Sequence, residues 1–302
     1  MSKILVVGSL GYDRISTPQG QVDQVLGGSA NYFSLAASMY SEVNVVGVVG
    51  NDYKMEDKQM LTQRGVCTEG LQQVDGKTFF WEGRYEGDMN EAITVQTELN
   101  VFKDFNPALP ENYRDSEFVF LANIDPILQQ DVLKQVKSPK LVGVDTMNFW
   151  IQSKKQDLLK VLTQVDVLLI NEGEARELTG QWNGIESAET LSALGPKAVV
   201  IKRGEYGFIL YMQGEYFILP AFPIKKVVDP TGAGDTFAGG FFGFLSKLDN
   251  PLNLESLKLA CVHGCLMASF TVQDFGVNPL VGLTWADIER RHADFLKVVS
   301  YH

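Results

Sequence analysis

The sequence predicts an α/β protein with a mostly parallel central sheet that helices cover on both faces. Short apolar runs, typical of fully buried strands, alternate along the chain with longer helical stretches. Residues 77–102 break this alternation, because they indicate two strands around a turn, the second apolar on one face only. We therefore expect a single domain over residues 1–302, with a small β lid inserted at about 77–102.

The predicted strands of the parallel sheet are short and almost wholly apolar. They are residues 4–8, 43–50, 118–121, 141–144, 167–170 and 198–201. An antiparallel pair is expected at 208–211 and 216–219. Helices are expected to begin near Ser29, Ala233, Leu254 and Trp285, and the polar stretch 14–26 is expected to be irregular.

The composition narrows the classes of function. The net charge is −11, whereas proteins that bind nucleic acids usually carry a basic face, so no nucleic-acid partner is expected. An anionic ligand must then be held locally, by backbone amides, a metal ion or a few placed Lys and Arg side chains.

Three cysteines predict no disulfide framework. No apolar run reaches membrane-spanning length and no signal-peptide pattern is present, which favours a cytoplasmic protein without a membrane partner.

The most informative stretch is residues 229–240, Asp-Pro-Thr-Gly-Ala-Gly-Asp-Thr-Phe-Ala-Gly-Gly. Gly232, Ala233 and Gly234 are small, and an apolar helical pattern follows them directly. Their amides should therefore lie at a helix N-terminus, where unpaired N–H groups and the helix dipole bind anions. Phosphoryl transfer requires such a site for the charge on the moving group.

Asp235 follows this predicted anion site. A carboxylate there repels phosphate, but it is well placed to accept a proton from an attacking hydroxyl, which indicates a general base. The alternative is that Asp235 only caps the helix. The full stretch, with Gly239 and Gly240 inside the helix, favours the catalytic role.

Residues 229–240 resemble the C-terminal signature of the ribokinase-like, or PfkB, carbohydrate kinases, and other landmarks follow in that family's order along nearly the whole chain. The resemblance implies a ribokinase-like fold with ATP and Mg²⁺ as cofactors. It also implies that Asp13 binds substrate hydroxyls, together with the backbone of Gly27 and Gly28 and the side chain of Asn31. The spacing from the glycine pair to Asn31 is one residue shorter than in ribokinase-type members.

The same resemblance implies a nucleotide site. Residues 171–174 fit the family's Asn-x-x-Glu motif, so Asn171 is assigned to the nucleotide and Glu174 to Mg²⁺, through water. Gly264 falls where some relatives carry an Asn that contacts adenine. Asp229 and Thr231 match positions that help to bind a monovalent cation in some members, with Gly276 in the same loop. Thr231 is also assigned to the nucleotide, and use of K⁺ is left open.

Several polar residues follow predicted strands, at the edge where α/β sheets bind ligands. Lys202 or Arg203 is a candidate for a contact with the nucleotide phosphates, Gly204 is a candidate for the nucleotide, and Asn123 is a candidate for the substrate. Three more candidates for either ligand are Asp125, Asp145 and Asn148. Each of these residues can equally be an ordinary loop start.

Together these observations predict an ATP-dependent phosphotransferase that acts on a hydroxyl of a small sugar-like molecule. A nucleoside kinase is the alternative, because Phe79, Phe80 and Trp81 in the lid can form an apolar pocket for a base. A third hypothesis is a non-catalytic ligand sensor. The intact Asp235 argues against it, because sensing does not require a catalytic base. The exposed apolar face of the lid hairpin suggests a homodimer formed through the lid.

Overall fold

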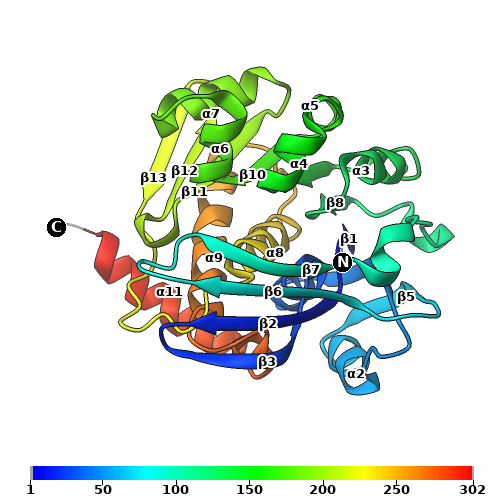
Figure 1. Ribbon diagram of the computed structural model, residues 1–302. Coiled ribbons are helices and arrows are strands. Elements are labelled where there is room, and N and C mark those ends of the chain that lie inside the picture. The colour runs from blue at the N-terminus through cyan, green and yellow to red at the C-terminus, as the bar shows by residue number, and fades with distance from the viewer. Residues whose placement is uncertain (1–2, 301–302) are drawn as a thin grey trace.

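The computed structural model describes residues 3–300, which form two β-sheets and eleven α-helices (Figure 1). The larger sheet has the strand order β13-β12-β11-β10-β9-β8-β1-β4-β5. Its strands are β1 (Lys3–Val7), β4 (Glu42–Val49), β5 (Val66–Gln73), β8 (Phe118–Leu121), β9 (Leu141–Val144), β10 (Val167–Asn171), β11 (Ala198–Lys202), β12 (Phe208–Met212) and β13 (Glu215–Leu219). All neighbours are parallel except β11–β12 and β12–β13, which confirms the predicted fold class.

Helices cover both faces of this sheet, because alternate strand residues point to opposite sides. Ile4 and Val6 belong to one buried cluster, and Leu5 and Val7 belong to the other. The first cluster includes residues of α1 (Ser29–Ala37), α2 (Met55–Gln63), α8 (Ala233–Leu245), α9 (Leu254–Thr271), α10 (Asn278–Val281) and α11 (Trp285–Val299). The second includes residues of α3 (Pro126–Leu133), α4 (Asn148–Ser153), α5 (Lys155–Leu162), α6 (Glu172–Thr179) and α7 (Gly184–Ala193).

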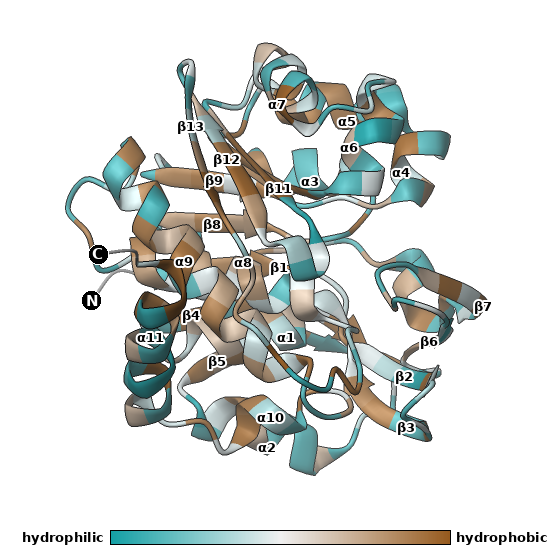
Figure 2. Cartoon of the chain, turned by 90° about the vertical axis from the view of Figure 1, so that its left-hand side faces the viewer, coloured by the Kyte–Doolittle hydropathy of each residue, from teal (hydrophilic) through white to brown (hydrophobic). Residues whose placement is uncertain are grey.

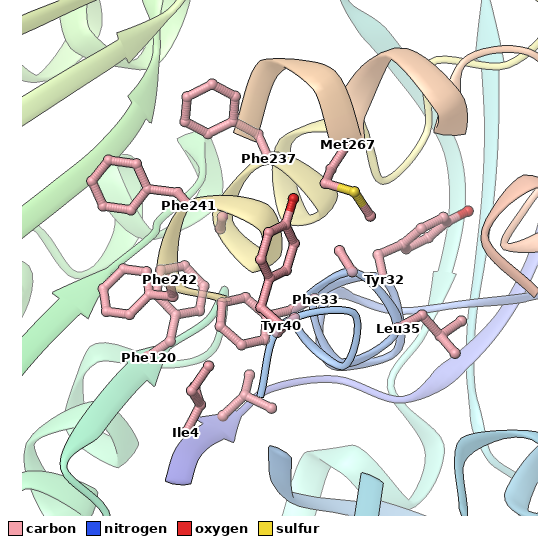
Figure 3. Close-up of a cluster of buried hydrophobic side chains, with 14 of the residues drawn as sticks. Ile4, Tyr32, Phe33, Leu35, Tyr40, Phe120, Phe237, Phe241, Phe242 and Met267 are labelled. Atoms are coloured by element: carbon pink, nitrogen blue, oxygen red, sulfur yellow. The ribbon is translucent and has the colours of Figure 1, made fainter. Parts of the chain in front are cut away.

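Close packing of α8 fixes the position of its N-terminus. Phe33 of α1 stacks on Phe120 of β8 with ring centroids 4.6 Å apart, at the centre of the aromatic core in Figure 3. A Cβ on Gly239 would lie 2.4 Å from the Phe33 carbonyl oxygen, and one on Gly240 would lie 2.9 Å from the carbonyl oxygen of His263 in α9. The two glycines inside α8 therefore let it lie directly against α1 and α9.

The smaller sheet is the lid, with the strand order β3-β2-β6-β7. It consists of β2 (Gly11–Thr17), β3 (Gly20–Gly27), β6 (Phe79–Tyr85) and β7 (Ala92–Glu98), and Figure 2 shows it as a separate layer beside the body. Strands β6 and β7 lie where the hairpin was predicted. The prediction of irregular chain over residues 14–26 was wrong. Four of the eight β3 residues are exposed and only Leu26 and Gly27 are buried, so no apolar alternation marks this strand, which forms through its pairing with β2.

No helix within residues 3–300 combines the length and the apolar character that crossing a membrane requires.

Candidate active site

The first backbone amides of α8 have no side-chain cap, although the Ala233 amide already donates to the Pro230 carbonyl at 3.2 Å. Gly232 precedes the helix with φ of 72°, a left-handed conformation that favours glycine, and no side chain caps the helix. A Cβ on Gly232 would lie 2.4 Å from the ring of Tyr32, so the position also has no room for a side chain. Gly232, and not Asp235, is the N-cap residue. The amides that follow can hold an anion, as the sequence predicts.

Asp235 lies in the first turn of α8 and is partly buried. Burial raises the pKa of its carboxyl to about 7; the negative charge of Asp145 acts in the same direction, and Lys202 partly offsets both. A carboxylate with a pKa near neutrality can accept a proton during a reaction at physiological pH. This environment suits a general base.

Lys202 ends β11, Asp145 directly follows β9, and the two form an ion pair beside α8. The Lys202 Nζ lies 3.0 Å from Asp145 Oδ2, and the side chains are only 15% and 7% exposed. A Cβ on Gly234 would lie 3.0 Å from the same Nζ, so the amine reaches the first turn of α8. Burial alone would lower the pKa of Lys202, but the charges of Asp145, Glu174 and Asp235 raise it overall, which keeps the amine charged.

Asn171 and Glu174 cap helix α6 reciprocally. Asn171 Oδ1 accepts a hydrogen bond from the Glu174 amide at 2.8 Å, and Glu174 Oε2 accepts one from the Asn171 amide at 3.0 Å. Burial, and next the charge of Asp145, raises the pKa of the Glu174 carboxyl. Over residues 3–300 no group of three or more His, Cys, Asp or Glu side chains is arranged to hold a metal ion.

Asp13 approaches the site from the lid, on β2, where it is only 3% exposed. A Cβ on Gly27 would lie 1.9 Å from Asp13 Oδ2, so this glycine makes room for the carboxylate. Burial raises the pKa of Asp13, and the charges of Asp229 and Asp235 raise it further. Asp13 and Asp235 therefore share one electrostatic environment, as two sides of one site should.

Asn31 is completely buried behind the glycine pair. Its Nδ2 donates to the Gly27 carbonyl at 2.6 Å, and the hydroxyl of Tyr53 donates to its Oδ1 at 3.5 Å. Gly28 has φ of 90°, and a Cβ there would lie 2.6 Å from the Ser9 carbonyl oxygen. The Asn31 amide thus holds the glycine loop in place.

Three strand-end candidates make contacts with helices of the body. The Asn123 side chain accepts a hydrogen bond from Trp150 Nε1 at 3.0 Å and contacts the sulfur of Met147. Asp125 caps α3 and forms an ion pair with Lys154, whereas the Asn148 side chain donates to Glu177. The fourth strand-end candidate, Asp145, differs from these three, because its ion-pair partner Lys202 reaches α8.

Asp229 holds together the loop that precedes α8. It is completely buried, its Oδ1 accepts from the Thr231 amide at 2.9 Å, and its Oδ2 accepts from the Gly276 amide at 3.1 Å. The structure thus brings together the residues assigned to a monovalent cation. Gly264 lies on α9, where a Cβ would meet the Phe237 carbonyl oxygen at 2.8 Å, so it permits close packing of α9 on α8.

The turn of the lid hairpin reaches the opposite side of the site, a contact that the sequence did not predict. A Cβ on Gly204, after β11, would lie 2.2 Å from Asn90 Oδ1, and one on Gly173, in α6, would lie 3.5 Å from Glu91 Oε1. Figure 1 shows the β6–β7 turn extending toward the ends of β10 and β11. The lid therefore spans from Asp13 to the loops that were assigned to the nucleotide.

Trp81 of β6 pairs in register with Asp13 and lies on the same face of the lid sheet. Its Nε1 donates to the Thr94 hydroxyl at 3.2 Å, and its ring covers Gly83, where a Cβ would lie 1.9 Å from it. The lid thus carries a fixed, flat aromatic surface on the side of the Asp13 carboxylate.

Comparisons with known proteins agree with this geometry. The pfkB family carbohydrate kinase profile matches residues 1–281. The chain is similar to the cytidine kinase of Thermococcus kodakarensis, with 32% identity over 254 residues, which cover 82% of this chain and 90% of that protein.

Solved structures share the fold. The nucleoside kinase of Methanocaldococcus jannaschii matches with a TM-score of 0.77 at 22% identity, covering 97% of this chain and 99% of that one. The Arabidopsis thaliana ribokinase, complexed with ribose and ATP, matches with a TM-score of 0.75 at 21% identity, covering 96% and 98%. The chain therefore belongs to the pfkB family of carbohydrate kinases and is a phosphotransferase.

Proposed function

We propose that this protein transfers the γ-phosphate of ATP to a hydroxyl group of a small neutral sugar or sugar-like molecule, with Asp235 as the general base. The observation that carries the proposal is the position of Asp235. It lies in the first turn of an uncapped helix, beside the charged amine of Lys202, and its pKa is raised to about 7.

The proposed reaction uses these groups together. Asp235 accepts the proton of the acceptor hydroxyl as its oxygen attacks the γ-phosphorus and the bond to ADP breaks. The amides of Gly232 and Gly234 hold the negative charge that develops on the transferred group, and the Ala233 amide is a third donor, shared with the Pro230 carbonyl. Lys202 adds a fixed positive charge at the same place, because its Nζ already lies beside Gly234.

The acceptor should be neutral at its reactive end. The charges of Asp229 and Asp235 raise the pKa of Asp13, and the charges of all three carboxyl groups raise the pKa of Tyr32, so an additional negative charge among them is unfavourable. A polyol can donate hydrogen bonds to such carboxylates, whereas an acidic sugar is repelled. We therefore assign Asp13 and the Gly27 and Gly28 backbone to a neutral polyol, with Asn31 and Asn123 supporting the loops around it.

The nucleotide is assigned to the ends of β10 and β11. Lys202 and Gly204 lie at its phosphates, with Asn171, Thr231 and Gly264 around the remainder. Glu174 and Asp145 supply hard oxygen ligands, which suit Mg²⁺ bound through water and phosphate oxygens. When bound, Mg²⁺ neutralises phosphate charge. Carbonyl oxygens of the loop that Asp229 ties to Thr231 and Gly276 suit a monovalent cation such as K⁺.

A nucleoside is the second candidate acceptor. The flat surface of Trp81, fixed by Thr94 and lying over Gly83, favours it, since a base can stack on such a surface. A pyranose or inositol ring can pack on the same surface. The two acceptor classes therefore differ in whether a base or a sugar ring lies on Trp81.

The experiment is a measurement of ADP formation from Mg-ATP with neutral pentoses, hexoses, inositols, nucleosides and acidic sugars. We expect one neutral class to accelerate ADP formation and the acidic sugars to be inactive. Bound ATP without acceptor-dependent ADP formation in any class would contradict the proposed function.

We further propose that two copies associate through β7. This outer strand of the lid exposes Ile93 and Val95, which are 40% and 56% exposed, and Leu99 follows it at 46%. Sedimentation of the wild type should give a dimer that Val95→Lys dissociates; a monomeric wild type would contradict the assignment.

A further inference from the structure

Tyr32 lies on α1, directly after Asn31, and is only 1% exposed. Its ring fills the space that Gly232 leaves at the start of α8. In Figure 3 its hydroxyl points away from the aromatic core that Phe33 and Phe237 help to form. The tyrosine therefore extends from the core toward the predicted anion site.

The hydroxyl of Tyr32 is buried and has no hydrogen-bond partner among residues 3–300. This distinguishes it from the other buried tyrosines, whose hydroxyls all have a partner: Tyr12, Tyr40, Tyr53, Tyr85 and Tyr113. A buried hydroxyl without a hydrogen-bond partner destabilises the folded protein. We therefore expect a ligand, an ion or a water molecule to supply the missing partner.

The surroundings of this hydroxyl indicate which of these it is. Burial raises the pKa of Tyr32, and the nearby charges of Asp13, Asp229 and Asp235 raise it further. A bound anion would meet the same three carboxyl groups, which would repel it. A neutral hydroxyl can instead accept a hydrogen bond from the tyrosine while donating its own proton to a carboxylate.

We propose that Tyr32 is a substrate-binding residue whose hydroxyl donates a hydrogen bond to a hydroxyl oxygen of the neutral acceptor, which in turn donates to Asp13. The inference rests on the proposed function. Asp13 lies on the lid, and the lid turn contacts the body at Gly204, so the acceptor enters while the lid is open and is enclosed when it closes.

The test compares Tyr32→Phe with Tyr40→Phe as a matched control. Phe retains the ring that packs on Gly232 and removes only the oxygen. For Tyr32→Phe we expect kcat/KM for the acceptor to fall by about tenfold or more, through a higher KM, with KM for ATP changed by less than about twofold. Its Tm should not fall, because the free protein loses no hydrogen bond.

Tyr40, just after α1, is also buried, but its hydroxyl forms a hydrogen bond with Nδ1 of His263 of α9 at 3.1 Å. Tyr40→Phe should therefore lower the Tm and leave the acceptor kinetics unchanged. The two variants are thus expected to behave in opposite ways.

Acceptor analogues that each lack one hydroxyl add a second readout. The wild type should discriminate against one of them, and Tyr32→Phe should lose that discrimination. Unchanged acceptor kinetics, a rise in KM for ATP instead, or a Tm loss as large as that of Tyr40→Phe would each overturn the inference. Failure of the proposed function is distinct, because it appears in the wild type as an absence of acceptor-dependent ADP.

Discussion

The amine of Lys202 lies 3.0 Å from the carboxylate of Asp145 and at the same time beside Gly234, at the start of α8. Lys202 ends β11, Asp145 directly follows β9, and only β10 separates these two strands, so the sheet itself fixes the pair. A positive charge held in this way needs little rearrangement when phosphate arrives, which is the condition for electrostatic catalysis.

Replacing Lys202 should therefore affect both activity and stability. Lys202→Met leaves the Asp145 carboxylate buried without its partner, so we expect a loss of roughly 3–5 kcal/mol in the free energy of unfolding. The double variant Lys202→Met with Asp145→Asn should recover much of the stability but not the turnover. Urea unfolding and steady-state kinetics measure the two effects, and full activity of the double variant would contradict the role of the amine.

The pH dependence follows from the raised pKa of Asp235. A base must be deprotonated to act, so kcat/KM should increase as the pH rises through about 7. A rate that is flat from about pH 5 to pH 8 would contradict this assignment.

Stability should depend on pH with the opposite sign. The pKa of Asp235 in the folded protein, about 7, exceeds its value in the unfolded chain. The contribution of Asp235 to the free energy of unfolding is therefore fully present below about pH 4 and is lost as the pH rises through the folded pKa. Asp235→Asn, which cannot ionise, should gain stability over the wild type mainly above about pH 7. Urea unfolding of both proteins at several pH values measures the difference; an equal gain at low pH would contradict it.

Glu174 has a structural and a proposed metal role that one substitution separates. Glu174→Gln can still accept the hydrogen bond from the Asn171 amide, so the capping box and the Tm should be retained. The Mg²⁺ concentration needed for half-maximal activity should rise by about tenfold, the usual effect of losing a group that orients a metal. A lower Tm with an unchanged Mg²⁺ requirement would leave only the structural role.

Gly239 tests the packing that positions α8. A Cβ there meets a backbone oxygen of α1 at 2.4 Å, so Gly239→Ala should destabilise the protein by about 1–3 kcal/mol. Gly282→Ala is the control, because a Cβ at Gly282 has no neighbour within 4 Å. Thermal unfolding compares the two variants, and equal stability would show that α8 moves freely away from α1.

The sequence indicated the parallel sheet and the helix that carries Asp235, because buried strands and small residues before an apolar helix are local patterns. It did not indicate β3, whose pairing partner rather than its own residues makes it a strand. Nor did it indicate Tyr32, which reads as one more core aromatic in a helix. The structure alone shows its ring against Gly232 and its hydroxyl buried without a partner among residues 3–300, within the influence of nearby carboxyl charges.

The strand-end residues show the same limit. Lys202 and Asp145 were both recognised as candidates, but their pairing depends on the order of β9, β10 and β11 in the sheet. Asn123 followed a strand in the same manner and instead contacts Trp150 of α4.

The most direct test of the account is the turnover of Asp235→Asn with the acceptor that the wild type uses. Asn keeps the shape of the side chain and cannot accept the proton. We expect kcat to fall by roughly two to four decades, while ATP binding, measured by calorimetry, is retained. Turnover close to that of the wild type would contradict the central claim that Asp235 is the catalytic base.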